Sequence, residues 1–202
     1  MDMDRDMFGN VPPIGPRAAS HYRSFYSILP PPKLAQDLED RAERWARPRG
    51  VRRVTAADRL HISLNRLPDG ELTAPELLDD AIEVGASVRR ASFDLCFDVM
   101  EAWNGHKDDS GRRQYAIVLK CSAPPRGAED LYRDLRKEMG RYGLPVGPLK
   151  FEPHITVWYQ YDRMVSKRLV RPICFRADRF WLVHSITGAK RLEHIASWQL
   201  KF

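Results

Sequence analysis

Two short segments of this 202-residue chain each carry a histidine and a hydroxyl residue two positions apart. His61 precedes Ser63 within residues 60–64, and His154 precedes Thr156 within residues 153–157. Apolar residues alternate with these polar ones, and a period of two is typical of a strand with one buried face. Because side chains at positions i and i+2 share a face of a strand, each segment should present an imidazole and a hydroxyl together.

Such a pair of segments could perform acid–base chemistry on a phosphate ester. An imidazole with an ordinary pKa of about 6.5 can take a proton from water near neutral pH, while a second imidazole gives one to a leaving oxygen. Hydroxyl groups can donate hydrogen bonds to phosphoryl oxygens as negative charge develops there. In a single segment of this kind, the histidine more often has no catalytic role. Two copies, about half a chain length apart, predict two similar halves that share one site.

The segments and their flanks resemble the two-histidine phosphoesterases, in particular the bacterial RNA 2′,3′-cyclic phosphodiesterase branch, also labelled 2′-5′ RNA ligases. The resemblance covers roughly residues 22–202 and is carried by residues 22–30, 61–64, 151–157, 180–185 and 197–200. It implies an α+β fold of two pseudo-symmetric strand-helix-strand lobes, with sheets lining a central cleft and helices outside. It also implies that His61 and His154 are catalytic and that Ser63 and Thr156 bind phosphate.

The resemblance further implies a role for each histidine. In similar enzymes the C-terminal histidine activates water and the N-terminal one protonates the departing ribose oxygen, which leaves a 2′-phosphate. Carried over, His154 is the base and His61 the acid. The family often carries an arginine where this chain has Tyr159, and Tyr159 is retained here as a possible cleft residue that could stack on a base.

Two further positions depend on strand alternation. His184 and Ser185 are adjacent, so they face opposite sides of a strand, and the pattern does not decide which lines the cleft. The resemblance favours Ser185. Arg66 lies three positions after Ser63, so strict alternation places it on the opposite face, and we expect it to lie outside the site.

Other polar residues suggest weaker alternatives. Four basic residues that follow the second motif could contact phosphates or could be a solvated loop: Arg163, Lys167, Arg168 and Arg171. Four histidines could in principle gather around zinc: His61, His154, His184 and His194. No close-spaced ligand pair is present among them, and we expect neither a metal nor a cofactor.

Composition limits the class of protein. The formal net charge of +6 is compatible with RNA ends or cyclic nucleotides as partners. No apolar run approaches about 18 residues, so no membrane span is expected, and the acidic N-terminus does not read as a secretory signal. Cys96, Cys121 and Cys174 are odd in number and widely spaced, which predicts reduced, buried thiols rather than a disulfide framework. We expect a cytoplasmic monomer.

Periodicity and turn residues predict the order of elements. Residues 1–21 are rich in proline and glycine and are expected to form a flexible arm, followed by one bilobal domain over 22–202. Strands are expected at 22–29, around both histidine segments, and at 93–99, 115–121, 173–186 and 194–202. Helices are expected from residue 30 to about 47, after residue 73, and from residue 125, with a long hairpin loop at 104–113 and no full helix in 161–171.

The preferred function is metal-independent hydrolysis of a 2′,3′-cyclic phosphate to a 2′-phosphate. No glycine-rich phosphate loop and no ATP-ligase lysine motif are visible, so an ATP-driven ligase lacks support. A 2′-5′ RNA ligase activity would have to be the reverse of cyclic-phosphate opening. Hydrolysis of another cyclic phosphodiester, such as an ADP-ribose cyclic phosphate, and a non-catalytic module that binds RNA ends remain alternatives.

Overall fold

The chain forms two antiparallel sheets, seen in a computed structural model that describes residues 22–68, 75–108, 110–186 and 192–201. The expected arm at 1–21 lies outside the described residues. The first sheet has the order β2-β1-β7-β8 and the second the order β5-β4-β3-β6. The strands are β1 (Tyr22–Ile28), β2 (Ile62–Arg66), β3 (Phe93–Lys107), β4 (Arg113–Lys120), β5 (His154–Gln160), β6 (Lys167–Ala177), β7 (Arg179–Ile186) and β8 (Leu192–Gln199).

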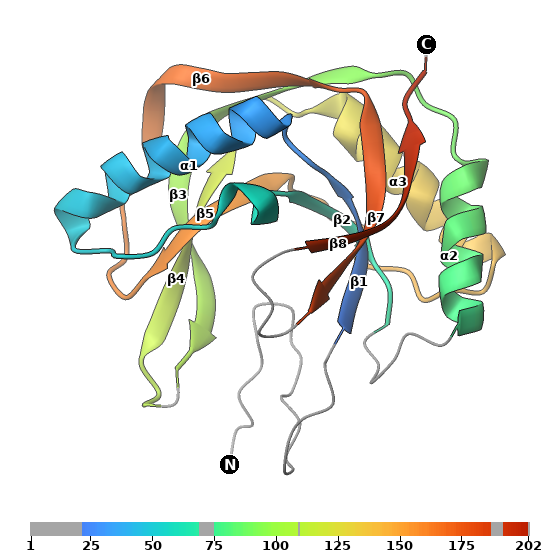
Figure 1. Cartoon of the computed structure of the whole chain (residues 1–202), viewed down its shortest axis with the longest axis horizontal. Helices are drawn as coiled ribbons and strands as arrows, with labels where there is room; N and C mark the ends of the chain where they lie inside the picture. The colour runs from blue at the N-terminus through green and yellow to red at the C-terminus, as the bar shows by residue number, and fades with distance from the viewer. Residues whose placement is uncertain (1–21, 69–74, 109, 187–191, 202) are drawn as a thin grey trace.

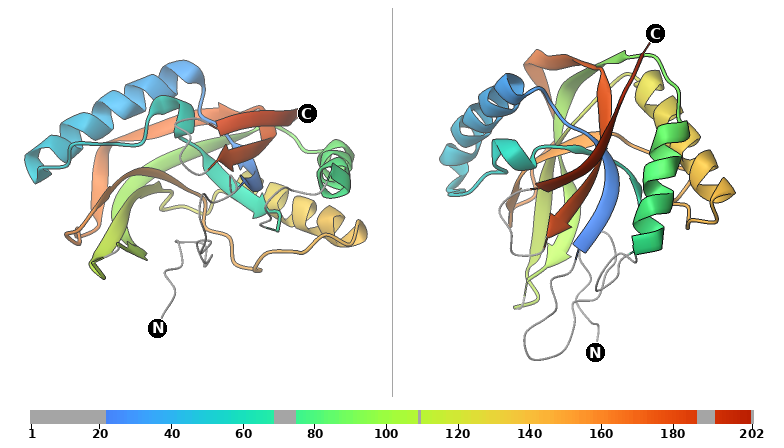
Figure 2. Two further views of the ribbon diagram at one scale, coloured as in Figure 1. Left: turned by 60° about the horizontal axis from the view of Figure 1, so that its bottom comes forward. Right: turned by 45° about the vertical axis from the view of Figure 1, so that its right-hand side comes forward.

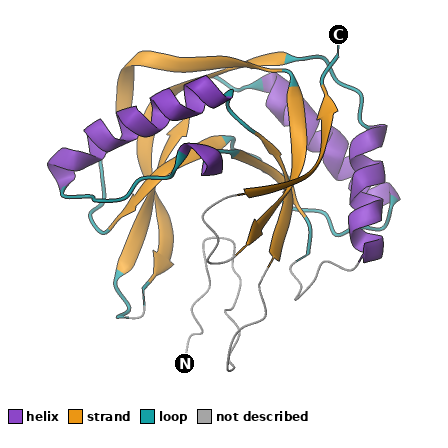
Figure 3. Ribbon diagram, viewed as in Figure 1, coloured by secondary structure: helices purple, strands orange, loops and turns teal. Residues whose placement is uncertain are grey.

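In the described part of the chain, three helices lie around the two sheets (Figure 3). They are α1 (Pro32–Ala46), α2 (Pro75–Ser87) and α3 (Arg126–Arg141). Two short 3₁₀ turns, Arg47–Arg49 and Ala57–Arg59, lie between α1 and β2. Proline at the start of α1 suits a first helical turn, where the missing N–H costs no hydrogen bond. The predicted α+β fold with two strand-rich lobes is therefore confirmed.

The segments β1-α1-β2 and β4-α3-β5 repeat one strand-helix-strand unit. In each unit the last strand carries a histidine motif and forms the edge of its sheet, and β2 and β5 contact each other. Helix α1 packs against β5, whereas α3 packs against β2. Each unit therefore sends its helix across to the other lobe, with α1 on one side of the molecule and α2 and α3 on the other (Figures 1 and 2).

The main hydrophobic core runs through both sheets and under the helices, and a smaller cluster holds Phe25, Val183 and Leu192. The inner face of α3 is buried at helical spacing, through Ala128, Leu131, Leu135 and Met139. Helix α2 approaches β8 so closely that a Cβ placed on Gly85 would lie 2.4 Å from the ring of Trp198, so this contact requires glycine. Among the described residues, no helix is long and apolar enough to cross a membrane.

The chain departs from the predicted elements at two places. The expected long loop at 104–113 is mostly strand: β3 continues to Lys107, and a short turn follows in which Asp108 donates its N–H to Arg112 over 2.9 Å. The expected single strand at 173–186 is two strands in different sheets, because the chain leaves β6 and enters β7 at Asp178. The amide of Leu200 donates to the Asp178 carbonyl over 2.7 Å at this crossing.

The prediction for the cysteines was wrong for two of the three. Cys96 and Cys174 are directly opposed on β3 and β6 and form a disulfide on an exposed face. Antiparallel pairing brings together residues 78 positions apart, which cysteine spacing alone could not indicate. Cys121 is a free thiol, and burial raises its pKa to about 11. The cytoplasmic location stays a prediction, without the support that reduced cysteines would have lent it.

Candidate active site

The two histidine motifs lie on the facing edge strands β2 and β5. Leu60, Ile62 and Leu64 are buried, as are Ile155 and Val157, while both histidines and both hydroxyl residues are half-buried. The predicted alternation therefore holds across both motifs. Each lobe directs one imidazole and one hydroxyl to the same face of its edge strand, and the two histidines lie near enough for the charge of His154 to lower the pKa of His61.

Both imidazoles are held by their own strand. Nδ1 of His61 lies 2.7 Å from the carbonyl oxygen of Arg59, and Nδ1 of His154 lies 2.9 Å from that of Glu152. A carbonyl oxygen only accepts, so each Nδ1 must carry the proton and donate it. In the neutral ring this leaves Nε2 as the basic nitrogen, so in both lobes Nε2 is the atom that can exchange a proton with a substrate.

Neighbouring aromatic rings pack against each imidazole. The ring centroids of Phe25 and His61 are 5.0 Å apart, and those of Trp103 and His154 are 4.3 Å apart. The indole N–H of Trp103 donates to Glu101. Lys120 lies between Glu101 and Glu152, with its ammonium nitrogen 2.9 Å and 3.1 Å from their carboxylate oxygens. This network ties β3 and β4 to the residue whose carbonyl orients His154.

A β-bulge follows the hydroxyl residue in each motif. In β2, Ser63 pairs with Ser27 and Arg66 with Phe25, so three steps on β2 match two on β1. In β5, two steps from Thr156 to Trp158 match one step on β4. The buried positions agree: Leu64 and Asn65 are consecutive buried residues, as are Val157 and Trp158. An extra residue of this kind reverses the alternation that follows it.

The bulge brings Arg66 to the face of β2 that carries Ser63, so the expectation that strict alternation places Arg66 on the opposite face was wrong. Arg66 is paired with Phe25, whose ring packs on His61, and paired residues share a face of a sheet. Tyr159 occupies the equivalent position in β5, three residues after Thr156, and is also brought to the cleft face. The two motifs are thus alike over six positions: His61, Ser63 and Arg66 in one lobe, and His154, Thr156 and Tyr159 in the other.

Two more arginines lie close to Tyr159. Burial raises the pKa of the Tyr159 hydroxyl, while the charges of Arg59 and Arg23 and a side-chain hydrogen bond with Thr156 lower it. Arg59 comes from the 3₁₀ turn before the first motif, and Arg23 comes from β1. Together with Arg66 they supply positive charge around the two histidines, and sequence reasoning missed all three.

The register of β7 separates His184 from Ser185. Ser185 pairs with Arg23, so it lies on the face of the first sheet that carries Phe25 and Ser63. His184 lies on the opposite face, where its Nδ1 is 2.7 Å from Oγ of Ser24. The fourth histidine, His194, packs its ring against Trp181 with centroids 4.7 Å apart. Among the described residues, no group of three or more histidines, cysteines and carboxylates is arranged to hold a metal ion.

The two cleft histidines differ electrostatically. The pKa of His61 is lowered to about 4, mainly by burial and also by the charges of His154 and Arg59, while the hydrogen bond to the Arg59 carbonyl acts in the opposite direction. Burial also lowers the pKa of His154, but its hydrogen bond to Glu152 and the charge of that carboxylate raise it. The charged neighbours therefore differ: Arg59 disfavours the protonated form of His61, whereas Glu152 favours the protonated form of His154.

The four basic residues that follow the second motif do not gather at the cleft. Arg168 is paired with Asp98, 3.0 Å away, and also donates to Oγ of Ser122. Lys167 and Arg171 line a cavity beside α1. Arg163 lines a separate groove that reaches Tyr159.

The fold is that of known phosphoesterases, although no protein-family model and no curated protein sequence matches the chain. Escherichia coli LigT, crystallised with 3′-AMP, superposes with a TM-score of 0.67 at 23% identity, over 90% of this chain and 99% of LigT. A crystal structure described as a phosphoesterase gives 0.67 at 23% identity, over 89% and 98% of the two chains. TT0787 of Thermus thermophilus gives 0.67 at 19% identity, also over 89% and 98%. The chain thus has the LigT fold, and the resemblance first seen in its two motifs is confirmed in three dimensions.

Proposed function

We propose that this protein hydrolyses 2′,3′-cyclic phosphates on RNA ends or nucleotides, without a metal, using His61 and His154 as an acid–base pair. The duplicated site carries the proposal: two imidazoles on facing edge strands, each with Nδ1 bound to a backbone carbonyl and Nε2 available. The fold supports it, since LigT shares this fold and has been crystallised with 3′-AMP, ATP and phosphate. We expect the protein to act as a monomer.

The reaction exchanges one P–O bond for another. One neutral Nε2 takes a proton from water as the water oxygen bonds to phosphorus, and the other, protonated Nε2 gives its proton to the ribose oxygen as that P–O bond breaks. Ser63 and Thr156 donate hydrogen bonds to the phosphoryl oxygens. Arg66, Arg23 and Arg59 provide positive charge where the transition state gains negative charge.

The roles of the two histidines can be assigned in two ways. The family resemblance gives His154 as base and His61 as acid. The charged neighbours of the unliganded site favour the reverse, because Arg59 disfavours a proton on His61 while Glu152 helps His154 to keep one. A bell-shaped pH profile would fit both assignments, since coupled groups titrate as a pair. Variant kinetics are needed to choose.

The experiment is hydrolysis of cytidine 2′,3′-cyclic phosphate in EDTA, with the product identified by chromatography. We expect His61→Ala and His154→Ala each to lower turnover by roughly 10²–10⁴, the usual contribution of a general acid or base. A nitrophenyl phosphodiester has a good leaving group, so its hydrolysis needs little help from a general acid. The variant that lacks the general acid should therefore regain part of its turnover on this substrate. Release of a 3′-phosphate would contradict the proposed orientation of the substrate.

The same assays address the alternatives. A non-catalytic module that binds RNA ends would bind the product without any turnover. An ADP-ribose cyclic phosphate hydrolase would prefer that substrate to the cytidine compound. RNA ligation would appear as joining of an end that carries a cyclic phosphate to a 5′-hydroxyl end, in competition with hydrolysis. If the wild-type protein has no activity on any cyclic phosphate, the proposed function is wrong.

A further inference from the structure

A groove of about 700 Å³ is lined by Tyr159 but by neither of the two histidines. Its walls come from three separate segments: residues 49–53 after α1, the β3–β4 turn, and residues 159–165 at the end of β5 and beyond it. We call it the arginine groove, after the five arginines that line it: Arg49, Arg52, Arg53, Arg112 and Arg163. Tyr159 belongs both to the face of β5 that carries His154 and Thr156 and to this groove, so the groove borders the candidate active site.

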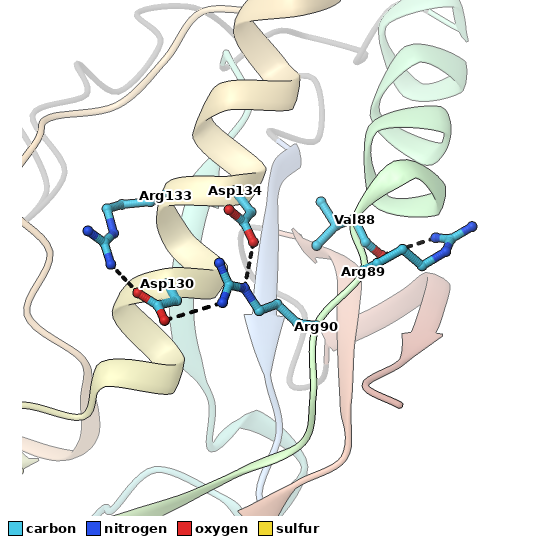
Figure 4. Close-up of polar contacts among 6 residues, drawn as sticks. All are labelled: Val88, Arg89, Arg90, Asp130, Arg133 and Asp134. Atoms are coloured by element: carbon cyan, nitrogen blue, oxygen red, sulfur yellow. Dashed lines mark hydrogen bonds and ion pairs between the residues drawn. The ribbon is translucent and has the colours of Figure 1, made fainter. Parts of the chain in front are cut away.

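The arginine groove holds a concentration of uncompensated charge. Asp162 is its one carboxylate among the lining residues, and none of the five arginines forms an ion pair within the part of the chain that the structure describes. Some arginines elsewhere in the described chain are paired with carboxylates. Arg90 lies between Asp130 and Asp134, and Arg133 also contacts Asp130 (Figure 4). Like charges held close together repel each other, so the groove is suited to a ligand that brings several negative charges.

Aromatic rings are interleaved with these arginines. Tyr159 is 37% exposed, and the guanidinium of Arg112 lies 4.0 Å from the ring centroid of Tyr161. The amide of Gln114 donates to the Tyr161 hydroxyl over 3.1 Å and so helps to fix this ring. Sites for single-stranded nucleic acid combine a basic groove along the backbone with planar groups on which bases stack. A simple anion would need the charge but not the rings.

We propose that the arginine groove binds the single-stranded ribonucleotide chain leading to the reacting cyclic phosphate, so that the preferred substrate is an oligonucleotide end rather than a mononucleotide. This inference rests on the proposed function for its reacting end. The volume of the groove falls within the range of ligand sites, roughly 300–1,000 Å³. Its arginines would contact phosphates preceding the terminal one, and Tyr159 would lie between the reacting group and the rest of the strand.

The chain offers a matched control. A second cavity, of about 430 Å³, is lined by four cations, Arg41, Arg44, Lys167 and Arg171, together with Trp45. It contains none of the residues of the two motifs. Removing two arginines there changes the net charge as much as removing two from the arginine groove. A difference between the two variants would therefore reflect local contacts with the RNA and not a general attraction of anions.

The test compares Arg52→Ala/Arg163→Ala with Arg41→Ala/Arg171→Ala. Each protein is assayed on cytidine 2′,3′-cyclic phosphate and on a five-nucleotide RNA ending in the same group, from low to moderate salt. The preference is the ratio of kcat/KM for the oligonucleotide to kcat/KM for the mononucleotide. In the groove variant this ratio should fall about tenfold at low salt. The slope of log KM against log salt concentration for the oligonucleotide should also decrease by about 1.4, because two phosphate contacts at roughly 0.7 each are lost. The control variant should keep the wild-type preference. Thermal unfolding verifies that both variants fold.

The outcomes separate this inference from the proposed function. If the wild type hydrolyses both substrates and the groove variant keeps its full preference, the arginine groove is not the strand site, although the function stands. If the wild type hydrolyses neither, the function fails, and binding of a 5′-labelled RNA measured by fluorescence anisotropy still tests the groove. Weaker binding by the groove variant alone supports the inference, and equal binding by both variants overturns it.

Discussion

Arg66 and Tyr159 occupy equivalent positions in the two lobes, but they bring different chemistry to the cleft. A guanidinium can pair with a phosphoryl oxygen through charge and directed hydrogen bonds, whereas a phenol contributes one weaker hydrogen bond and a flat ring. The first lobe therefore supplies the charge and the second supplies a surface on which a base can stack. Through this difference, two lobes of similar backbone form an asymmetric site.

We expect Arg66→Gln to lower kcat/KM on a cyclic phosphate by about tenfold to a hundredfold, because a hydrogen bond to a charged group contributes roughly 1.5–3 kcal/mol. Tyr159→Phe, which keeps the ring, should cost less than tenfold. Arg176→Gln is a matched control, since Arg176 pairs with Asp94 and lies next to neither motif. Wild-type kinetics in a folded Arg66→Gln variant would mean that this guanidinium does not reach the phosphate.

At the scale of elements, β3 connects the site to a disulfide farther along the same strand. Between Cys96 and Glu101 the pairing of β3 with β6 shifts and the buried positions change from Leu95 and Phe97 to Met100, so the disulfide to Cys174 is separated from Glu101 and Trp103 along the strand. Linking residues 78 positions apart restricts the unfolded chain far more than the folded one. The disulfide should therefore stabilise the pairing of β3 with β6 without taking part in the chemistry.

We expect Cys96→Ser/Cys174→Ser, or reduction with dithiothreitol, to lower the free energy of unfolding by about 2–4 kcal/mol. Turnover of a cyclic phosphate at 25 °C should change by less than about twofold. Urea unfolding and steady-state kinetics on the same samples measure both effects. The control is Cys121→Ser, which keeps the disulfide. A large loss of turnover in the folded double variant would show that the disulfide and the cleft are coupled.

At the scale of the whole molecule, enclosing two histidines between the lobes makes stability depend on pH. Burial lowers both pKa values in the folded chain, that of His61 to about 4, while the unfolded chain titrates near 6.5. As pH falls, the unfolded chain therefore takes up protons first. The histidine contribution to stability is fully present above about pH 6.5 and is lost as the pH falls toward 4.

We expect the free energy of unfolding to decrease between pH 7 and pH 4.5, with at most about 3 kcal/mol of that loss coming from His61, since one pKa unit corresponds to about 1.4 kcal/mol. In His61→Gln/His154→Gln the decrease should be smaller, although His184, which burial also shifts downward in pKa, remains in both proteins. Urea titrations at several pH values provide the comparison. An identical pH dependence in both proteins would show that the cleft histidines are not desolvated.

The sequence by itself determined the two motifs and the strands that carry them. A period of two and a period of 3.6 are local properties, so the buried faces of β2, β5, α1 and α3 could be read from the order of residues alone. The equivalence of the motifs also contains a signal for Arg66. Tyr159 is a cleft candidate three positions after Thr156, and the same offset from Ser63 leads to Arg66.

Only the tertiary structure decided which residues join the histidines and where the charge gathers. The bulges in β2 and β5 are defined by the register of neighbouring strands, so alternation within one strand misplaced Arg66. At Asp178 the buried positions change from odd (Ile173, Phe175 and Ala177) to even (Phe180 and Leu182), but only the pairing of the strands shows that the chain there passes from one sheet into the other. The disulfide and the arginine groove unite segments distant along the chain. Such contacts depend on how the two lobes pack, and the spacing of residues within one segment cannot predict that packing.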